Sequence, residues 1–356
     1  MRAVVLVGGE GTRLRPLTLA TPKQLLAVAE RSMIERVLDQ LANHGVDEAV
    51  LALGYRPDAF LEAFPSGRAS GVRLVYAVEP APLDTAGAVR FAATEAGIDE
   101  TFLVVNGDVL ADLDLGSLVE FHRWRGAEAT IALTPVEDPS SFGVVPTDPD
   151  GRVLAFIEKP PPGHVPTNLI NAGAYVLEPS VLGRIQAGRR VSIEREIFPA
   201  RAAEGTLFAM VSGSYWVDAG TPANYLWANL WLVGSHRPPV SDARETAPGV
   251  WVVGMAVIDG EVAGSSLVGE AAFVGAGSVV TNSVVGAGAR VESGASVTGS
   301  VLLAGAVVGQ GSRVEGSILG EGAVVAPEAV VRALSVVGPG EVVAAGTTVD
   351  GLRIPA

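Results

Sequence analysis

A glycine-rich turn with two cations follows directly on the first apolar segment of the chain. Residues 3–7 are apolar and include Leu6, and the segment after them contains Gly8, Gly9, Gly11, Thr12, Arg13, Pro16, Pro22 and Lys23. Glycines after a strand let backbone N–H groups approach phosphate oxygens without a Cβ in the way. Arg13 and Lys23 add positive charge around such oxygens. The segment therefore favours a triphosphate as its ligand.

Two better-known phosphate motifs do not fit this segment. A Walker A loop needs Gly-Lys-Ser/Thr, which is absent here. A dinucleotide fingerprint continues into a helix, and Pro16 and Pro22 interrupt that helix.

Two aspartates follow apolar segments of strand length. Asp108 comes after residues 102–105, and Asp218 comes after residues 215–217. A single aspartate at such a position is more often a helix cap or a turn residue. A pair of carboxylates at strand ends can instead share one Mg²⁺ that bridges the oxygens of two phosphate substrates.

The order of motifs along the chain resembles that of the sugar nucleotidylyltransferases, which join a nucleoside triphosphate to a sugar 1-phosphate and release pyrophosphate. After the glycine-rich segment come Leu-Asp-Thr-Ala-Gly at 83–87, Asn-Gly-Asp at 106–108, Phe-Ile-Glu-Lys-Pro at 156–160, Asn-Ala-Gly at 171–173 and Trp-Val-Asp-Ala-Gly-Thr-Pro at 216–222. The resemblance covers essentially the whole chain.

This resemblance implies three groups of site residues. The nucleotide-binding group is Leu6, Gly8, Gly9, Gly11, Thr12, Arg13, Lys23, Leu83, Asp84, Thr85 and Gly87. The sugar-phosphate group is Gly143, Glu158, Lys159, Asn171 and Gly173. Asp108 and Asp218 match the positions that hold Mg²⁺, and the implied catalytic set is Arg13, Lys23, Asp108, Lys159 and Asp218.

The implied reaction is an in-line attack by a phosphate oxygen of the sugar 1-phosphate on the α-phosphorus of the triphosphate. That oxygen is already anionic at neutral pH, so catalysis needs positioning and charge neutralisation rather than a general base. The chain has no Gly-x-Ser-x-Gly motif, and His44, His122, His164 and His236 lack metal-ligand spacing. We expect the histidines at surface or linker positions.

A further stretch, at 192–199, indicates which base the nucleoside triphosphate carries and which sugar 1-phosphate reacts with it. Ser-Ile-Glu-Arg-Glu-Ile-Phe-Pro at 192–199 resembles the mannose-1-phosphate guanylyltransferases, as do the 83–87 loop and the length of the C-terminal repeats. This favours GTP and mannose 1-phosphate as substrates. Asp84, however, stands where the family usually has glycine, and Pro-Lys-Gln-Leu-Leu at 22–26 is closer to the thymidylyltransferases. Thymidylyl-, uridylyl- or adenylyl-transfer to glucose 1-phosphate is the alternative.

The elements that position these residues alternate over residues 1–236. Strand-length apolar segments at 3–7, 49–53, 72–78 and 102–105 are separated by helical patterns at 33–43, 58–64 and 85–96. Such alternation predicts a Rossmann-like, doubly wound mixed sheet with its site beyond the carboxyl ends of the strands. Further strands are expected at 130–134, 142–145, 153–157 and 172–177, and the proline-containing residues 237–249 are typical of a linker.

Residues 250–356 repeat with a period of 17. One aliphatic series is Val268, Val285, Leu302 and Leu319, a second is Val274, Val291, Val308 and Val325, and a third is Val280, Val297, Val314 and Val331. Three series per turn predict a three-sided solenoid of stacked aliphatic layers rather than a disordered Gly/Ala-rich tail. The resemblance makes it a left-handed β-helix of hexapeptide repeats. We expect it to be structural and to pack on the catalytic part or on another subunit, which favours a homo-oligomer.

Composition limits the partners and the compartment. The net charge of −14 disfavours nucleic acid and anionic membranes, because both attract basic surfaces. The absence of cysteine excludes disulfides and thiolate chemistry within the chain. Apolar residues begin the sequence without a signal-peptide pattern, and no long uncharged apolar run follows. We therefore expect a cytoplasmic protein.

Two other classes of function remain open at this stage. The same fold could bind a nucleotide sugar without turnover and regulate an active partner, although the five catalytic positions are all retained. An acyltransferase built on the solenoid is disfavoured, because such enzymes place a catalytic histidine near the coils and residues 250–356 contain none.

Overall fold

The computed structural model describes residues 1–161, 165–212, 215–235 and 237–355. It divides into two compact units. The sheet unit comprises Met1–Gly9 and Ile34–Val217, and the solenoid unit comprises Glu10–Met33 and Asp218–Ala356. The boundaries expected from sequence, 1–236 and 250–356 with a linker between them, stay a prediction. In the structure, residues 10–33, which contain most of the glycine-rich segment, belong to the same compact unit as the C-terminal part of the chain.

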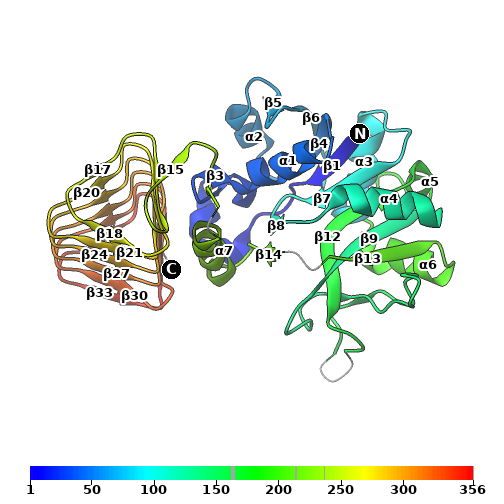
Figure 1. The fold of residues 1–356 in the computed structure, drawn as a ribbon. Coiled ribbons are helices and arrows are strands. Elements are labelled where there is room, and N and C mark those ends of the chain that lie inside the picture. The colour runs from blue at the N-terminus through cyan, green and yellow to red at the C-terminus, as the bar shows by residue number, and fades with distance from the viewer. Residues whose placement is uncertain (162–164, 213–214, 236, 356) are drawn as a thin grey trace. The chain divides into compact units, whose positions relative to one another are not determined.

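The sheet unit is built on a mixed sheet whose path is β11-β10-β12-β7-β1-β4-β6-β5, with β9 beside β12 and β13 beside β9 (Figure 1). Strands β7, β1, β4 and β6 run parallel, and β12 runs antiparallel to β7 and β9. The mixed α/β sheet expected from the sequence is thereby confirmed. The strand bounds are β1 Arg2–Leu6, β4 Glu48–Leu53, β5 Arg68–Ala69, β6 Val72–Val78, β7 Phe102–Asn106, β9 Ala129–Pro135, β10 Gly143–Val144, β11 Ile157–Glu158, β12 Leu169–Leu177 and β13 Leu207–Val211.

The helices of the sheet unit follow the predicted periodicities closely at the N-terminal end. They are α1 Met33–Asn43, α2 Pro57–Ala63, α3 Asp84–Glu95, α4 Leu115–Arg125, α5 Pro179–Leu182 and α6 Phe198–Ala203, and a π-helical turn, η4, spans Ile193–Ile197. A two-stranded sheet pairs β8 (Val109–Ala111) with β14 (Trp216–Asp218). The strand predicted at 153–157 is wrong except at Ile157, which begins β11. Val153 makes only a single bridge to Thr147, and the ladder is confined to β11.

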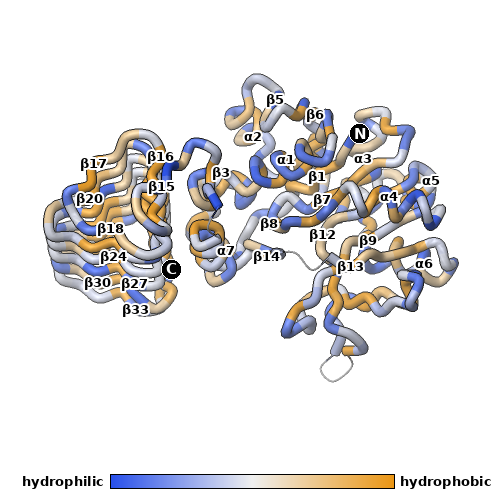
Figure 2. Tube along the Cα trace, viewed as in Figure 1, coloured by the Kyte–Doolittle hydropathy of each residue, from blue (hydrophilic) through white to orange (hydrophobic). Residues whose placement is uncertain are grey.

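The core of the sheet unit lies along the central strands, which Figure 2 shows as hydrophobic. Val4, Val50 and Val104 on three adjacent strands are fully buried, and all belong to one apolar cluster. A strand that is buried on both faces has a continuous apolar sequence, and this is why the central strands could be predicted from the sequence.

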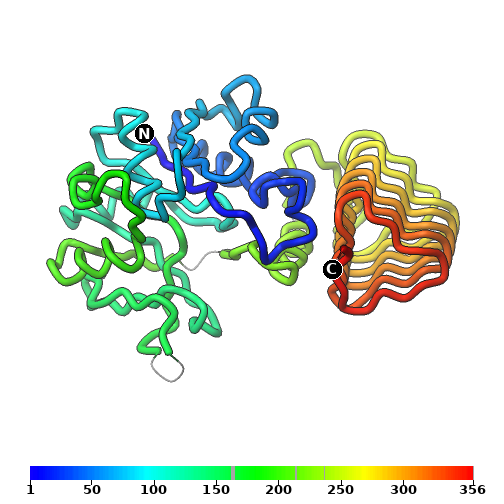
Figure 3. The backbone as a smooth tube through the Cα atoms, turned by 180° about the vertical axis from the view of Figure 1, so that it is seen from behind, coloured from blue at the N-terminus to red at the C-terminus, as the bar shows by residue number. Residues whose placement is uncertain are grey.

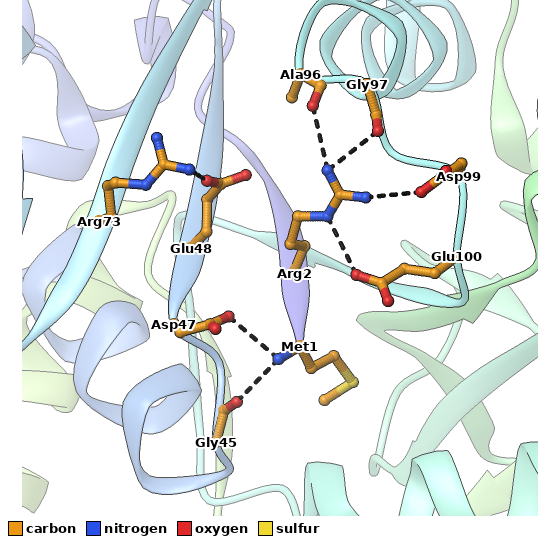
Figure 4. Close-up of polar contacts among 10 residues, drawn as sticks. All are labelled: Met1, Arg2, Gly45, Asp47, Glu48, Arg73, Ala96, Gly97, Asp99 and Glu100. Carbon is orange, nitrogen blue, oxygen red and sulfur yellow. Dashed lines mark hydrogen bonds and ion pairs between the residues drawn. The ribbon is translucent and has the colours of Figure 1, made fainter.

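The amino ends of the parallel strands are held by polar contacts that Figure 4 shows. The Arg2 guanidinium donates to the carbonyls of Ala96 (3.2 Å) and Gly97 (3.1 Å), which follow α3, and pairs with Asp99 and Glu100. Beside it the Met1 amine pairs with Asp47, and Arg73 pairs with Glu48. Most of these partners are exposed, so each ion pair contributes little stability. The Arg2 guanidinium does, however, satisfy carbonyl groups at the end of α3, where a helix leaves its last carbonyls without partners.

The C-terminal part of the solenoid unit is a three-sided stack of short parallel strands, coil upon coil (Figure 3). The first side contains β15 Ala243–Ala247, β16 Val250–Val253, β19 Ser266–Val268, β22 Val284–Val285, β25 Val301–Leu302, β28 Ile318–Leu319, β31 Val336–Val337 and β34 Arg353–Ile354. The second contains β17 Val257–Ile258, β20 Phe273–Val274, β23 Arg290–Val291, β26 Val307–Val308, β29 Val324–Val325 and β32 Val342–Val343. The third contains β18 Glu261–Ala263, β21 Val279–Thr281, β24 Ser296–Thr298, β27 Arg313–Glu315, β30 Val330–Arg332 and β33 Thr348–Asp350.

The predicted aliphatic columns are confirmed. All three series point inward and form one buried cluster. The period becomes 18 in the last coil, where Leu319 pairs with Val337 and Val331 with Val349. The extra residue falls at a turn in which Ala333 and Leu334 both have positive φ. The first side also carries a column of buried serines, in which the Oγ atoms of Ser266, Ser283 and Ser300 each accept the N–H of the serine one coil further, at 3.3, 3.1 and 3.1 Å. These bonds satisfy polar groups that burial would otherwise leave unpaired.

The remaining elements of the solenoid unit lie before the coils. Residues 10–33 form three short 3-10 turns, η1 (Thr12–Leu14), η2 (Leu17–Leu19) and η3 (Lys23–Leu25), and a hairpin of β2 (Ala27–Val28) and β3 (Arg31–Ser32). Helix α7 spans Pro222–Gly234. Part of the predicted linker, β15, pairs antiparallel with β16. None of the helices within the described ranges is long and apolar enough to cross a membrane.

The inward columns predict a contrast between neighbouring valines on one strand. Val280 is fully buried, whereas Val279 is 37% exposed. Val280→Ala should lower the free energy of unfolding by about 1.5–3 kcal/mol, because it removes apolar area from a packed layer. Val279→Ala should change it by less than about 0.5 kcal/mol. Denaturant titration followed by circular dichroism measures both, and equal losses would contradict the inward stacking.

Candidate active site

The strand ends of β1 and β7 bring two motifs of the sheet unit together. The Gly107 N–H donates to the Leu6 carbonyl at 2.9 Å. A Cβ on Gly107 would lie 2.7 Å from Val7 Cγ1, so only glycine allows this approach. Asp108 follows immediately, partly buried, at the carboxyl end of the parallel strands. This is the edge at which open α/β sheets bind their ligands.

The Leu-Asp-Thr-Ala-Gly motif at 83–87 forms the start of α3, after β6, which is two strands from β1 in the sheet. The Leu83 N–H donates to Glu79 Oε2 at 2.9 Å, and Asp84 Oδ1 accepts the Thr85 N–H at 2.9 Å. Asp84 has a φ of 61°, a conformation that favours glycine, and glycine is what the family usually has there. The Asp84 carboxylate is exposed at the first turn of α3.

The segment at 189–197 is fastened to the same loop. Thr85 Oγ1 donates to Glu194 Oε2 at 2.7 Å and accepts the Ile193 N–H at 2.8 Å. The Gly87 N–H donates to the Val191 carbonyl at 3.2 Å, and a Cβ on Gly87 would lie 3.0 Å from the Arg189 carbonyl. Gly87 therefore has a packing reason to be glycine. The two stretches that suggested a guanylyltransferase in the sequence are in direct contact.

The expected sugar-phosphate residues lie on β10, β11 and β12. Gly143 and Glu158 are paired across β10 and β11, and a Cβ on Gly143 would lie 2.6 Å from the Phe156 ring and 3.0 Å from Glu158 Oε2. Lys159 has a φ of 49°, and its Nζ lies 4.0 Å from Glu158 Oε1. Strained backbone of this kind persists where the surroundings impose it, often at functional sites. The Lys159 side chain is 63% exposed and therefore accessible to a ligand.

Asn171 is oriented by its own strand. Its Oδ1 accepts the Gly173 N–H at 2.9 Å, and its Nδ2 donates to the Tyr175 hydroxyl at 2.9 Å. The register of β12 on β9 shifts between Asn171 and Tyr175. Gly173 has a φ of 75° and a Cβ there would lie 2.7 Å from Asn106 Nδ2. Asn171 and Gly173 are therefore both fixed in place beside the end of β7.

Electrostatics link the residues on these strands. Burial raises the pKa of Glu158 above its usual value, the nearby Glu194 carboxylate raises it further, and Lys159 and Arg195 oppose the shift. Burial raises the pKa of Tyr175 strongly, and Glu194, Glu158 and Asp108 add to that shift. The Tyr175 hydroxyl therefore stays neutral at physiological pH and accepts the hydrogen bond from Asn171.

The solenoid unit holds the remaining cations and the second aspartate. Arg13 Nη2 lies 3.6 Å from Asp218 Oδ2, and Asp218 Oδ1 accepts the Gly220 N–H at 2.9 Å. A Cβ on Gly220 would lie 2.7 Å from that oxygen and 2.8 Å from Arg13 Nη2. The Asp-Ala-Gly motif at 218–220 thus makes room for the arginine. Thr221 caps α7 by accepting the Asn224 N–H, which fixes the residues just after the aspartate.

Lys23 is placed by the glycine-rich turn itself. Gly11 has a φ of 62°, its carbonyl accepts the Thr18 hydroxyl at 2.8 Å, and a Cβ on it would lie 3.1 Å from Lys23 Cβ. Thr12 and Arg13 in η1 are exposed. Gly8 and Gly9 belong to the sheet unit, and Gly9 has a φ of 103°. The expected site residues are therefore divided between the two units.

Sequence reasoning missed several residues on which this geometry depends. Glu194 receives two hydroxyl donors, from Thr85 and Ser192 (2.7 Å), and Glu79 holds the Leu83 N–H. Trp216 donates from Nε1 to the Ala172 carbonyl at 2.9 Å and lies edge-on to Phe142. Glu194 and Trp216 lie inside motifs that the sequence did single out. Glu79 had no signal, because a lone glutamate after a strand is usually solvated.

The expectation for the histidines was wrong for one of them. His122 is buried on α4, where its ring contacts the Thr130 hydroxyl (2.8 Å) and the Glu178 carboxylate (3.1 Å). Burial lowers the pKa of His122 below its usual value, although Glu178 opposes the shift. His44 is partly buried, and its Nδ1 lies 2.9 Å from the Gln40 carbonyl, to which it can only donate. His164 and His236 lie outside the described residues.

Comparison with known proteins decides the family. A nucleotidyl transferase model matches residues 2–233, and a model described as the GMPPB C-terminal domain matches residues 262–355. The chain belongs to the nucleotidyl transferase family. The resemblance inferred from the motifs is thus confirmed, and with it the expectation of a sugar-1-phosphate nucleotidylyltransferase.

Two relatives show how far this family membership extends. The mannose-1-phosphate guanylyltransferase of Mycobacterium tuberculosis is 40% identical over 289 residues, which are 78% of this chain and 77% of the relative. A catalytic subunit beta of mannose-1-phosphate guanylyltransferase from Drosophila melanogaster is 41% identical over 260 residues, 72% of this chain and 69% of the relative.

Solved structures show the same catalytic fold. HddC from Yersinia pseudotuberculosis, complexed with GMP-PN, is 27% identical with a TM-score of 0.56 and covers 64% of this chain and 97% of its own. A putative glucose-1-phosphate thymidylyltransferase from Bacillus anthracis is 25% identical with a TM-score of 0.59 and covers 65% of this chain and 94% of its own.

The packing of Arg13 on Asp218 gives a sharp test in this nucleotidyl transferase. Gly220→Ala places a methyl group where Arg13 Nη2 and Asp218 Oδ1 now lie, so kcat/KM should fall by roughly 10- to 100-fold while the protein stays folded. Gly234→Ala at the other end of α7 is the matched control, since its Cβ would meet no atom closer than 3.5 Å. Pyrophosphate release measures both, and full activity in the Gly220 variant would contradict the role given to this contact.

Proposed function

We propose that the chain is a mannose-1-phosphate guanylyltransferase, which makes GDP-mannose and pyrophosphate from GTP and mannose 1-phosphate. The observation that carries this proposal is about 40% identity to mannose-1-phosphate guanylyltransferases of distant organisms over some three quarters of the chain. The HddC structure with GMP-PN supports a guanine nucleotide in this fold. The contact between Thr85 and the 192–194 segment supports it further, because both stretches resemble these enzymes.

In this reaction a phosphate oxygen of mannose 1-phosphate forms a bond to the α-phosphorus of GTP. The bond from that phosphorus to the bridging oxygen of the β-phosphate breaks, and pyrophosphate leaves with both electrons. No proton has to move at neutral pH. Arg13 and Lys23 neutralise the triphosphate, and Lys159 orients the sugar phosphate, so that the two anions can approach. Gly143, Glu158, Asn171 and Gly173 surround the sugar.

We propose further that Mg²⁺ is bound by Asp108 and Asp218. The donor chemistry fits, since both are aspartates and Mg²⁺ usually takes one or two carboxylates together with water and phosphate oxygens. Within the described ranges no group of three or more potential metal-binding side chains occurs, so a cage made by the protein alone is not part of this proposal. When bound, the ion neutralises charge that develops on the phosphate oxygens.

Assembly into a homo-oligomer is also proposed. Met255 and Val257 on the first coil are neighbouring apolar side chains that are 86% and 55% exposed. Burial of this surface against a second copy of the chain would remove it from water, which favours association.

The substrate pair is tested by a matrix of nucleoside triphosphates against mannose, glucose and galactose 1-phosphates. We expect the highest kcat/KM for GTP with mannose 1-phosphate, and a strong preference for the base, because a buried polar group left unpaired by a wrong base costs about 1–3 kcal/mol. The preference for the sugar should be smaller, since mannose and glucose differ in one hydroxyl. Pyrophosphate release scores every pair. A higher kcat/KM for dTTP or UTP with glucose 1-phosphate would overturn this assignment but not the family.

The metal assignment predicts that Asp108→Asn folds normally and loses activity by about 10²-fold or more at saturating Mg²⁺, the scale of a lost preorganised electrostatic contact. Asp150→Asn is the control, since Asp150 is an exposed turn residue that pairs with Arg125. Turnover rates against Mg²⁺ concentration distinguish the two variants. An Asp108→Asn enzyme with the wild-type rate would show that the carboxylate does not hold the ion.

A further inference from the structure

The catalytic cations Arg13 and Lys23 lie on a segment with little regular structure of its own. Between β1 and α1 the chain forms three 3-10 turns and a hairpin of two-residue strands. Such short turns have few internal hydrogen bonds, so their conformation must be fixed by whatever packs against them. The contacts of residues 10–33 within the solenoid unit therefore decide how firmly the two cations are held.

Helix α7 supports one side of the β2–β3 hairpin. The Ala29 N–H donates to the buried Asn229 side chain at 2.8 Å, and the Tyr225 hydroxyl donates to the Ala27 carbonyl. Ala29 and Glu30, at the tip of the hairpin, both have positive φ (47° and 72°). A two-residue turn of this type suits a hairpin, but side chains other than Gly, Asn and Asp adopt it at a cost.

The coils of the solenoid contact the same tip. Glu30 Oε1 accepts the Ala287 N–H at 3.2 Å, and Glu30 Oε2 lies 2.6 Å from the point that a Cβ on Gly269 would occupy. Burial raises the pKa of Glu30, the Ala287 N–H opposes that shift, and the carboxylates of Asp242 and Glu270 add to it. Burying a carboxylate near two other carboxylates costs free energy. The hydrogen bond from the Ala287 N–H offsets part of that cost and holds Glu30 against the coil.

Two contacts from the last coils reach the turn that follows Arg13. Gly338 leaves room for Pro16, whose Cβ lies 2.9 Å from where a Cβ on Gly338 would be. Arg353 Nη1 donates to the Arg15 carbonyl at 3.2 Å, across 338 residues of sequence. The coils therefore contact the chain on both sides of the two cations. Glu30 makes the contact beyond Lys23, and Arg15 and Pro16 make it next to Arg13.

We propose that the solenoid is a positioning element for the triphosphate, and that Glu30 and Arg353 are its positioning residues. Neither touches the substrate. Each fixes the backbone that carries a cation, Glu30 on the side of Lys23 and Arg353 on the side of Arg13. The coils were expected to be purely structural, and these contacts give them a part in substrate binding. The inference rests on the proposed function, in which Arg13 and Lys23 bind the triphosphate.

The test uses the full chain and the double variant Glu30→Ala/Arg353→Ala. The Kd and KM for GTP should rise by about tenfold or more, because the cations lose their fixed position, whereas the KM for mannose 1-phosphate should change by less than about twofold. The control is Glu292→Ala/Arg332→Ala, which removes the same two residue types. Their ion pairs, Arg290–Glu292 (2.9 Å) and Arg332–Asp350 (2.8 Å), stay within the coils.

Conservative variants separate positioning from stability. Glu30→Gln/Arg353→Lys keeps an acceptor for the Ala287 N–H and a donor for the Arg15 carbonyl, so it should restore most of the GTP affinity. Any of three results would overturn the proposal. The first is an unchanged GTP Kd in the alanine double variant, and the second is an equal loss of affinity for GTP and for mannose 1-phosphate. The third is an equal loss of GTP affinity in the control. If the double variant unfolds at assay temperature, Arg353→Ala alone serves, since Arg353 is exposed, and an unchanged Kd there has the same meaning.

Failure of the proposed function gives a different result. If the wild type prefers another substrate pair, the Kd is measured for the triphosphate that it prefers, and weaker binding in the double variant still supports positioning by the coils. If the wild type binds no triphosphate, the proposed function and this inference both fail.

Discussion

The ion pair between Arg13 and Asp218 is the contact on which the proposed chemistry depends most. An enzyme that joins two phosphate substrates must place cations accurately, and this chain has 25 basic against 39 acidic residues. Arg13 reaches Asp218 because Gly220 has no side chain to block it. The pair has a further consequence for charge. When phosphate oxygens attract part of the arginine's charge, the Asp218 carboxylate attracts a second cation more strongly. Ligand binding and the arrangement of these side chains are therefore coupled.

A second constraint acts at the carboxyl ends of the parallel strands. Three motifs that lie far apart in the sequence lie on or directly after the adjacent strands β10, β12 and β7, and glycine makes a close approach possible at each. Gly107 lies against β1, Gly173 against Asn106, and Gly143 against Phe156 and Glu158. Where the family motif has glycine and this chain has Asp84, the backbone keeps the positive φ. The backbone at this position therefore has the conformation that favours glycine, although its side chain is a carboxylate.

The solenoid and the glycine-rich segment show how stability and function are connected through packing. The coils are stable through repetition, with valine and leucine columns inside and a serine column that satisfies its own N–H groups. A rigid stack of this kind is well suited to hold a segment that lacks regular structure. The contacts of Glu30, Pro16 and Arg15 with the coils extend that rigidity to the backbone beside Arg13 and Lys23.

By itself the sequence determined the family, the mixed sheet and the three aliphatic columns. It could do so because each is encoded by local spacing: apolar runs for buried strands, a 17-residue period for coils, and short motifs whose residue types follow from phosphate chemistry. It failed over most of 153–157, where only Ile157 belongs to a strand and Val153 makes a single bridge. It also failed at His122, which is buried against Glu178 and Thr130.

The tertiary structure decided which distant residues meet. Thr85 bonds to Glu194 across 109 residues of sequence, and Gly220 makes room for Arg13 across 207. Glu30 and Arg353 connect the coils to the chain around the glycine-rich segment across 257 and 338 residues. No periodicity encodes such pairs, because the separation between the partners is fixed by the folds of the segments between them. A lone glutamate in a hairpin and an arginine near the end of the chain have no signal of their own. Their roles exist only once packing has placed a backbone N–H or a carbonyl within reach.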